Sequence, residues 1–160
     1  MKRTSRFIFS FMLSLLLLTN AYASWVYKGP TPKYSAIEIS KELGRVSIGD
    51  RGYPATFCAA TYNPCFHSEA LSFAIPTRFQ LNEQWDAAGQ HFKIVGSKKM
   101  ITTGRATHVF LIQHRANGAK LLFLYSPIYG LVGIAEMREK SIILKIEGGC
   151  GFPMESCTPK

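Results

Sequence analysis

The sequence contains four histidines, His67, His91, His108 and His114, which are the side chains best suited to acid–base chemistry or metal binding near neutral pH. Glu69 follows His67 by two residues, so in an extended chain the two could form an acid–base pair or supply two metal ligands. His108 and His114 lie on one predicted strand, but six residues place them about 20 Å apart, too far to share a metal ion. We keep His67 and Glu69 as candidate catalytic residues against the alternative of ordinary polar loop residues. We expect no metal and no cofactor.

The four cysteines form two segments of equal spacing, Cys58 to Cys65 and Cys150 to Cys157. An even number of cysteines in an exported chain predicts two disulfides. We expect each segment to close on itself, as Cys58–Cys65 and Cys150–Cys157, and the two cross-pairings between the segments remain open. Structural zinc sites favour ligands two to four residues apart, and a redox centre of the thioredoxin type needs Cys-x-x-Cys, so neither fits this spacing.

Aromatic side chains surround these cysteine segments. The rings are Tyr53, Phe57, Tyr62, Phe66 and Phe152. Rings on disulfide-tied loops can form a recognition surface, because a rigid loop loses little entropy on binding. The alternative is that the rings tuck beneath the loops and extend the core.

A basic cluster consists of Lys93, Lys98, Lys99 and Arg105, and it surrounds a turn predicted at residues 96–99. Lys98 and Lys99 could form a positive hairpin tip that binds an anionic surface. The alternative is a solvated turn, since lysines near strand edges also discourage aggregation. We expect no nucleic acid partner, because this stretch lacks interleaved exposed aromatic residues.

Two segments favour short helices. Ser35 and Glu38 form a capping-box pattern that predicts a helix over 36–43, although alternating isoleucines within it also fit a strand. Asn82 is a suitable cap for a helix over 83–88, with a glycine after it.

The rest of the chain is typical of β-structure. Strands are predicted at 45–48, 70–75, 91–95, 106–114, 121–125, 131–137 and 142–147, and Asn117-Gly118 predicts a hairpin turn. Residues 121–125 are apolar on both faces, as in a central strand, whereas 142–147 alternate as in an edge strand. We therefore predict a mainly β (α+β) fold: a curled antiparallel sheet or small barrel-like meander, with one or two short helices and two disulfide-tied loops.

Residues 1–23 have the pattern of a cleavable signal peptide, with a basic start, an apolar run and Ala21 and Ala23 before the expected cut. The apolar run is short for a membrane span, although an uncleaved anchor is the alternative. The first cysteine is Cys58, so the chain lacks the cysteine that a lipoprotein would carry at the cut. We predict a periplasmic or secreted protein without a transmembrane anchor, having an extended arm at 24–34 and a single β-rich domain at 35–160.

The charge of the mature chain differs from that of the whole sequence. The whole sequence has 19 Lys and Arg and 10 acids, a formal charge of +9, and removing the three cations of the leader lowers it to about +6. Such an excess favours anionic partners or serves solubility. No nucleophile motif such as Gly-x-Ser-x-Gly is present.

These features predict a small exported binding domain, without enzymatic activity, that recognises a protein or cell-envelope component, as inhibitors, immunity-type proteins and envelope accessory factors do. Two alternatives remain open: a small envelope hydrolase that uses His67 and Glu69, and a basic module that docks on anionic lipid or polymer.

Overall fold

The computed structural model describes residues 24–31, 35–58, 64–102, 104–116, 119–136 and 143–154. Within these ranges the chain forms strands and turns, without a helix. The strands are β1 (Ser24–Lys28), β2 (Ile37–Ser40), β3 (Arg45–Ile48), β4 (Arg51–Phe57), β5 (Cys65–Ser68), β6 (Ser72–Ala74), β7 (Gln84–Ala87), β8 (Gln90–Thr102), β9 (Arg105–Ala116), β10 (Ala119–Ser126), β11 (Gly130–Glu136) and β12 (Ile143–Ile146).

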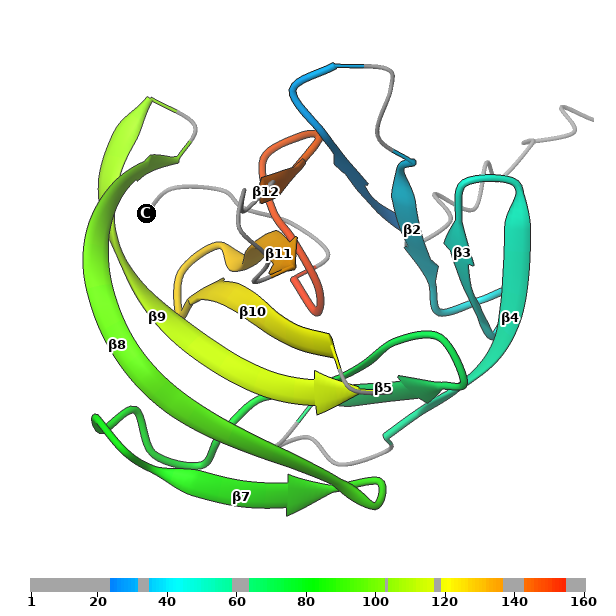
Figure 1. Cartoon of the computed structure of the whole chain (residues 1–160). Helices are drawn as coiled ribbons and strands as arrows, with labels where there is room; N and C mark the ends of the chain where they lie inside the picture. Colours follow the sequence, from blue (N-terminus) through cyan, green and yellow to red (C-terminus); the bar gives the residue numbers. More distant parts are fainter. Residues whose placement is uncertain are drawn as a thin grey trace, which may run out of the picture.

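All of these strands belong to one antiparallel sheet in the order β6-β5-β4-β3-β2-β1-β12-β11-β10-β9-β8-β7. The two edges, β6 and β7, follow each other in the chain, so the sheet is a meander that nearly closes into a barrel-like shape. Figure 1 shows the long β8–β9 hairpin curving around one side, with β10 to β12 within its curve and β2 to β4 opposite. The predicted curled antiparallel sheet is confirmed.

Both predicted helices are wrong. Ile37 and Ile39 are both buried, on one face of β2. The alternation of these isoleucines, and not the capping-box pattern, therefore determined the local structure. The second segment forms β7, which pairs with β8 through a turn at Ala88 and Gly89. Both turn residues have positive φ, 50° and 71°, as a two-residue hairpin turn of type I′ requires. The glycine therefore ends a strand and not a helix.

The turn predicted at 96–99 is also wrong, because β8 continues through it to Thr102. The register with β9 shifts between Ile94 and Gly96, which marks a β-bulge at the end of the strand predicted over 91–95. The chain reverses only between Thr102 and Arg105. Lys98 and Lys99 therefore lie within a strand, and their side chains alternate between its two faces.

Strands β1 and β12 are more central than their sequences suggest. The expected arm contains β1, which pairs with β2 on one side and with β12 on the other. Trp25 and Tyr27 of β1 are buried in the core. β12, predicted as an edge, lies between β1 and β11, and its lysine side chain is exposed without being at a sheet edge.

The main core fills the inside of the curled sheet. Its largest fully buried aromatic side chains are Tyr27, Phe66, Phe73, Phe92 and Phe123. A second apolar cluster, made by Val109, Leu124, Tyr129, Val132 and Ala135, lies on the opposite face of β9, β10 and β11. The central position predicted for residues 121–125 is confirmed, because side chains of β10 enter both clusters.

The Cys58–Cys65 disulfide is present, with its two Cα atoms 5.1 Å apart. The second predicted pair, Cys150–Cys157, lies partly outside the described residues, because Cys157 is not among them. No cysteine in the described ranges is free. Asn117-Gly118 and the predicted signal peptide also lie outside the described residues. In the part of the chain that is described, no helix has the length and apolar character needed to cross a membrane.

Candidate functional site

The structure places His67 beside a serine and not beside the predicted glutamate. His67 Nδ1 lies 2.6 Å from Ser72 Oγ, across the β5–β6 pair. Ser72 is only 4% exposed, so its hydroxyl is closed to a substrate. Glu69 is exposed in the turn after β5. Among the described residues, no three His, Cys, Asp or Glu side chains are arranged to hold a metal ion.

The aromatic residues of the cysteine segments are divided between core and surface. Phe66 and Phe152 are buried, with their rings edge to face at 5.2 Å. Phe57 is half-buried and packs on both, 6.1 Å from each ring. Tyr53 is half-buried on β4, and Tyr62 lies outside the described residues. In this structure Phe66 and Phe152 extend the core and present no recognition surface.

Phe152 also anchors the chain segment that follows β12. Its backbone amide donates to the Tyr27 hydroxyl at 3.1 Å, and its carbonyl accepts from the Leu131 amide at 2.8 Å. Trp25 packs edge to face on its ring at 5.1 Å and donates its indole hydrogen to the Met154 carbonyl. Burial raises the pKa of Tyr27 well above its usual range, so the hydroxyl keeps its proton. The described part of the second cysteine segment, residues 150–154, is thus structural.

The excess positive charge is confined to one part of the sheet. Between Asp86 and Glu136 the sequence has no acid and six cations: Lys93, Lys98, Lys99, Arg105, Arg115 and Lys120. The other 10 of the 16 cations in residues 24–160 are matched by all 10 acids. The whole excess of about +6 therefore lies on β8, β9 and β10, which we call the acid-free strands.

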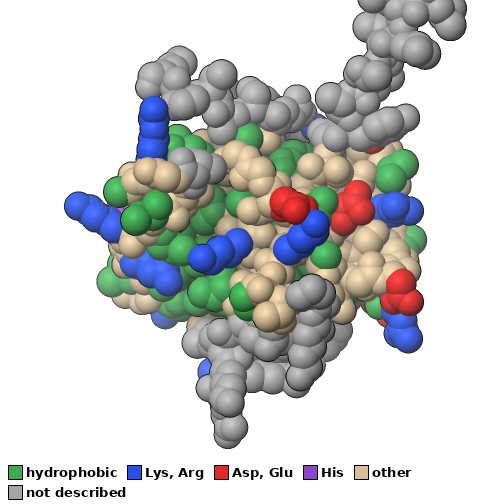
Figure 2. Space-filling view, turned by 90° about the horizontal axis from the view of Figure 1, so that it is seen from above, with side chains coloured by type: hydrophobic (Ala, Val, Ile, Leu, Met, Phe, Trp, Pro, Cys, Tyr) green, Lys and Arg blue, Asp and Glu red, His purple; other side chains and the backbone are tan. Residues whose placement is uncertain are grey.

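Figure 2 draws one face of the molecule and shows an uneven distribution of charge. In the face drawn in Figure 2, Lys and Arg side chains spread across the width, whereas Asp and Glu side chains gather at one side. In the balanced part, cations meet carboxylates, as Lys28 does with Glu147 at 2.6 Å. The described acid-free strands, by contrast, carry no carboxylate of their own, although Asp86 of the neighbouring β7 contacts His91.

The strand register brings polar donors together on the face of β8 and β9 that points away from the main core. Lys93 pairs with Gln113, so the preceding His91 lies opposite Arg115. Side chains on such cross-strand neighbours are about 5 Å apart at Cβ. The four side chains line a pocket of about 270 Å³. Lys120 extends the positive surface, because β10 places it beside Arg115.

The acid nearest to this pocket already has a partner. Asp86 lies opposite His91 on β7, and its Oδ1 is 2.9 Å from His91 Nδ1. This contact leaves His91 Nε2 available to a ligand. Lys, Arg, Gln and His all supply hydrogen-bond donors, and the planar guanidinium can bind a carboxylate or phosphate through two bonds. The pocket is therefore suited to an oxyanion.

Behind the pocket, on the core face of the same strands, lies His114. It is 1% exposed and stacks on Phe92 with ring centres 4.7 Å apart. Its Nδ1 must carry a hydrogen, because its partner at 3.1 Å is the His91 carbonyl, which can only accept. Nε2 is buried without a protein partner in the described structure. Burial lowers the pKa of His114, the hydrogen bond to the His91 carbonyl opposes this shift, and the charges of His67 and His91 add to it. The net lowering favours the neutral ring.

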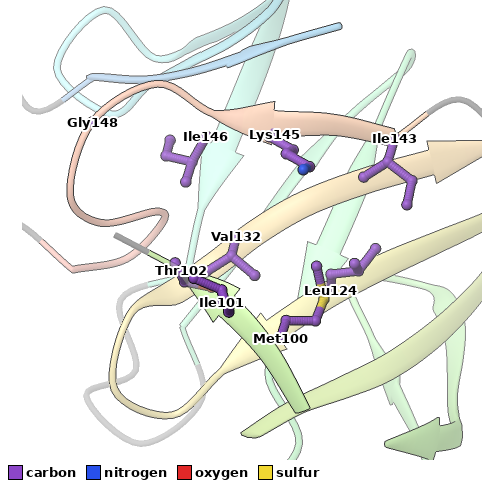
Figure 3. A pocket seen from close by; sticks show the side chains of 9 residues that line it. All are labelled: Met100, Ile101, Thr102, Leu124, Val132, Ile143, Lys145, Ile146 and Gly148. Carbon is purple, nitrogen blue, oxygen red and sulfur yellow. The ribbon is translucent and has the colours of Figure 1, made fainter. Parts of the chain in front are cut away.

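A second pocket lies between the end of the β8–β9 hairpin and β12, and it is largely apolar (Figure 3). Its volume is about 120 Å³, and its lining residues are Met100, Ile101, Thr102, Leu124, Val132, Ile143, Lys145, Ile146 and Gly148. Sequence reasoning missed this pocket, because four strands contribute to it. The sequence analysis also did not single out Arg115 and Gln113. The absence of acids from residues 87–135 could have indicated a basic surface that includes Arg115.

Comparisons of the chain with protein-family models, with curated proteins and with solved structures give no match.

Proposed function

We propose that this protein is an exported binding domain, without enzymatic activity of its own, that docks on an anionic component of the cell envelope through its acid-free strands. The observation that carries the proposal is the segregation of charge along the chain: six cations and no acid between Asp86 and Glu136, with Asp86 itself held by His91 at the edge of the pocket. A basic surface needed only for solubility would not require this separation, because scattered charges serve solubility equally well.

The pocket of His91, Lys93, Gln113 and Arg115 is the most specific part of this surface. It combines three positively charged or protonatable groups with a neutral amide, all on one sheet face. An oxyanion seated there would accept charge-assisted hydrogen bonds from both strands. At about 30 Å³ per water, 270 Å³ would hold a phosphoryl or carboxyl group together with several waters.

Two other functions have less support. A hydrolase based on His67 and Glu69 lacks their expected pairing, since His67 contacts the buried Ser72. Recognition through the cysteine loops loses Phe66 and Phe152, which are buried. The anionic-docking function uses side chains that are exposed or half-buried in the described structure.

The test is a titration of the mature chain with inorganic tripolyphosphate, followed by backbone NMR. We expect saturable shifts at the four pocket residues, and affinity that falls steeply as salt rises. Lys93→Gln and Arg115→Gln should each weaken binding about fivefold, the effect of about 1 kcal/mol expected at a solvated site.

The matched control is Arg45→Gln with Arg51→Gln, which removes the same charge from the balanced part of the chain. Equal losses from the control pair and from the pocket pair would mean that only net charge matters, and would contradict a site on the acid-free strands. Saturable shifts confined to other strands would contradict it too.

A further inference from the structure

We propose that the apolar pocket between the β8–β9 hairpin and β12 binds the end of an alkyl chain, so that the anionic component is a lipid or similar amphiphile. This inference rests on the proposed function, because the pocket borders the acid-free strands. The charged group of such a ligand would lie beside Lys98 and Lys145, since the pocket of His91 and Lys93 is about 20 Å away along β8. It names the partner class that the basic surface alone leaves undefined.

The pocket has a buried apolar floor and walls from separate strands. Leu124 of β10 and Val132 of β11 form the floor and are buried. Met100 from β8 and Ile143 and Ile146 from β12 form the walls, and Figure 3 shows these side chains around a common space. The lining is therefore largely apolar, as an alkyl chain requires, and its polar side chains are Thr102 and Lys145.

The charges around the pocket favour an anionic occupant, since the flanking acid, Glu147, is paired with Lys28. Lys145 belongs to the lining itself. The adjoining hairpin carries Lys98, Lys99 and Arg105, and the described residues of β8 and β9 include no acid. Lys98 lies on the same strand face as Met100, whereas Lys99 lies on the other face. Ile101, at the end of β8, is 79% exposed, more than the other large apolar residues in the described ranges. An exposed isoleucine among cations is typical of a surface that enters the headgroup region of an anionic membrane.

The volume sets the length of chain that fits. An apolar cavity of 150 Å³ is large enough for benzene, and the pocket has about 120 Å³. At about 30 Å³ for each small group, the pocket would hold about four carbons. Each buried methylene should raise affinity about fourfold, the fold-change that corresponds to its transfer from water. The gain should stop once the pocket is full.

The experiment compares inorganic phosphate with methyl, butyl, hexyl and octyl phosphate, each below its micelle concentration, by calorimetry on the mature chain. We expect affinity to rise about fourfold per methylene up to about four carbons and then to level off. Shifts of the Val132 and Ile143 methyl signals in NMR spectra should accompany the longer chains and be absent with inorganic phosphate.

Val132→Phe should fill the pocket and abolish the dependence on chain length, while binding of tripolyphosphate is retained. Val95→Phe, at the bulge in β8, makes the same change at an exposed position and should leave the series unaltered. If Val132→Phe does not fold, Ile143→Phe at the pocket wall gives the same test. Lys145→Gln should weaken every alkyl phosphate by a similar factor.

Affinity independent of chain length would overturn this inference and leave the proposed function standing, provided that tripolyphosphate still binds. Failure of tripolyphosphate and of all alkyl phosphates would overturn both. A pocket occupied by a second copy of the chain would instead give a mass that rises with concentration and falls to the monomer in Val132→Phe. That outcome would also refute the alkyl-chain site.

Discussion

Acidification should destabilise this protein through one buried histidine, His114. Its ring is 1% exposed, is neutral in the folded state, and has a pKa that burial holds below the ordinary value of 6.5. In the unfolded chain the same ring titrates near 6.5. Between the folded pKa and 6.5, the unfolded state therefore binds more protons than the folded state, and the free energy of unfolding falls as pH falls.

The size of the effect follows from this difference. Stability contributed by the neutral ring is fully present above pH 6.5 and decreases by up to about 1.4 kcal/mol per pH unit below it. From pH 7.5 to 5.5 the loss from His114 alone should therefore be at most about 1.4 kcal/mol, the limit for a ring that takes up no proton in the folded state. The groups that act on it are His67, on the facing β5, and His91, on the neighbouring β8; charging either opposes protonation of His114.

The assay is urea unfolding with the disulfide intact, at pH 7.5, 6.5 and 5.5, of the wild type and of His114→Phe. The phenylalanine keeps the stack on Phe92 and removes the titrating group. It should lower stability at every pH, because the His91 carbonyl loses its hydrogen bond, but the decrease between pH 7.5 and 5.5 should be smaller than in the wild type.

His108→Phe changes an exposed histidine and should keep the wild-type pH dependence. An unchanged pH dependence in His114→Phe would refute the reasoning, as would a wild type that gains stability on acidification. Either result would mean that the ring is charged in the folded state or that another group dominates the titration.

Two further predictions concern the segment after β12 that contains Gly151 and Phe152. Phe152→Ala should reduce the free energy of unfolding, measured by urea unfolding, by about 3 to 5 kcal/mol, because the ring is buried against Trp25 and Phe66. Ile128→Ala, at a residue 66% exposed, should change it by less than about 0.5 kcal/mol. Gly151→Ala should cost at least about 2 kcal/mol, because the new Cβ would collide with the Leu131 backbone, whereas Gly52→Ala has room for its methyl group; similar melting temperatures for these two glycine variants would show that the segment can move away from β11.

Some strands were predictable because the local pattern of apolar residues matches the burial of the strand in the folded sheet. Residues 121–125 are apolar on both faces, and β10 is indeed covered on both sides. The predicted helix at 36–43 failed because a capping pattern contributes only about 1 kcal/mol, less than burying two isoleucines of β2 in the core. The sequence of β12 resembles that of an edge strand because it contains an exposed lysine. Its actual neighbours, β1 and β11, are set by long-range pairing.

In the candidate sites, too, some features follow from the sequence and others depend on long-range strand pairing. Composition by itself determined the charge of the chain, its even number of cysteines and the run without acids between Asp86 and Glu136. Only the tertiary structure decided that Phe66 and Phe152 point inward, and that His91 and Lys93 face residues about twenty positions later in the chain. The physical reason is register: an antiparallel pairing brings distant residues within about 5 Å, and a one-residue slip would turn every side chain of the pocket toward the core.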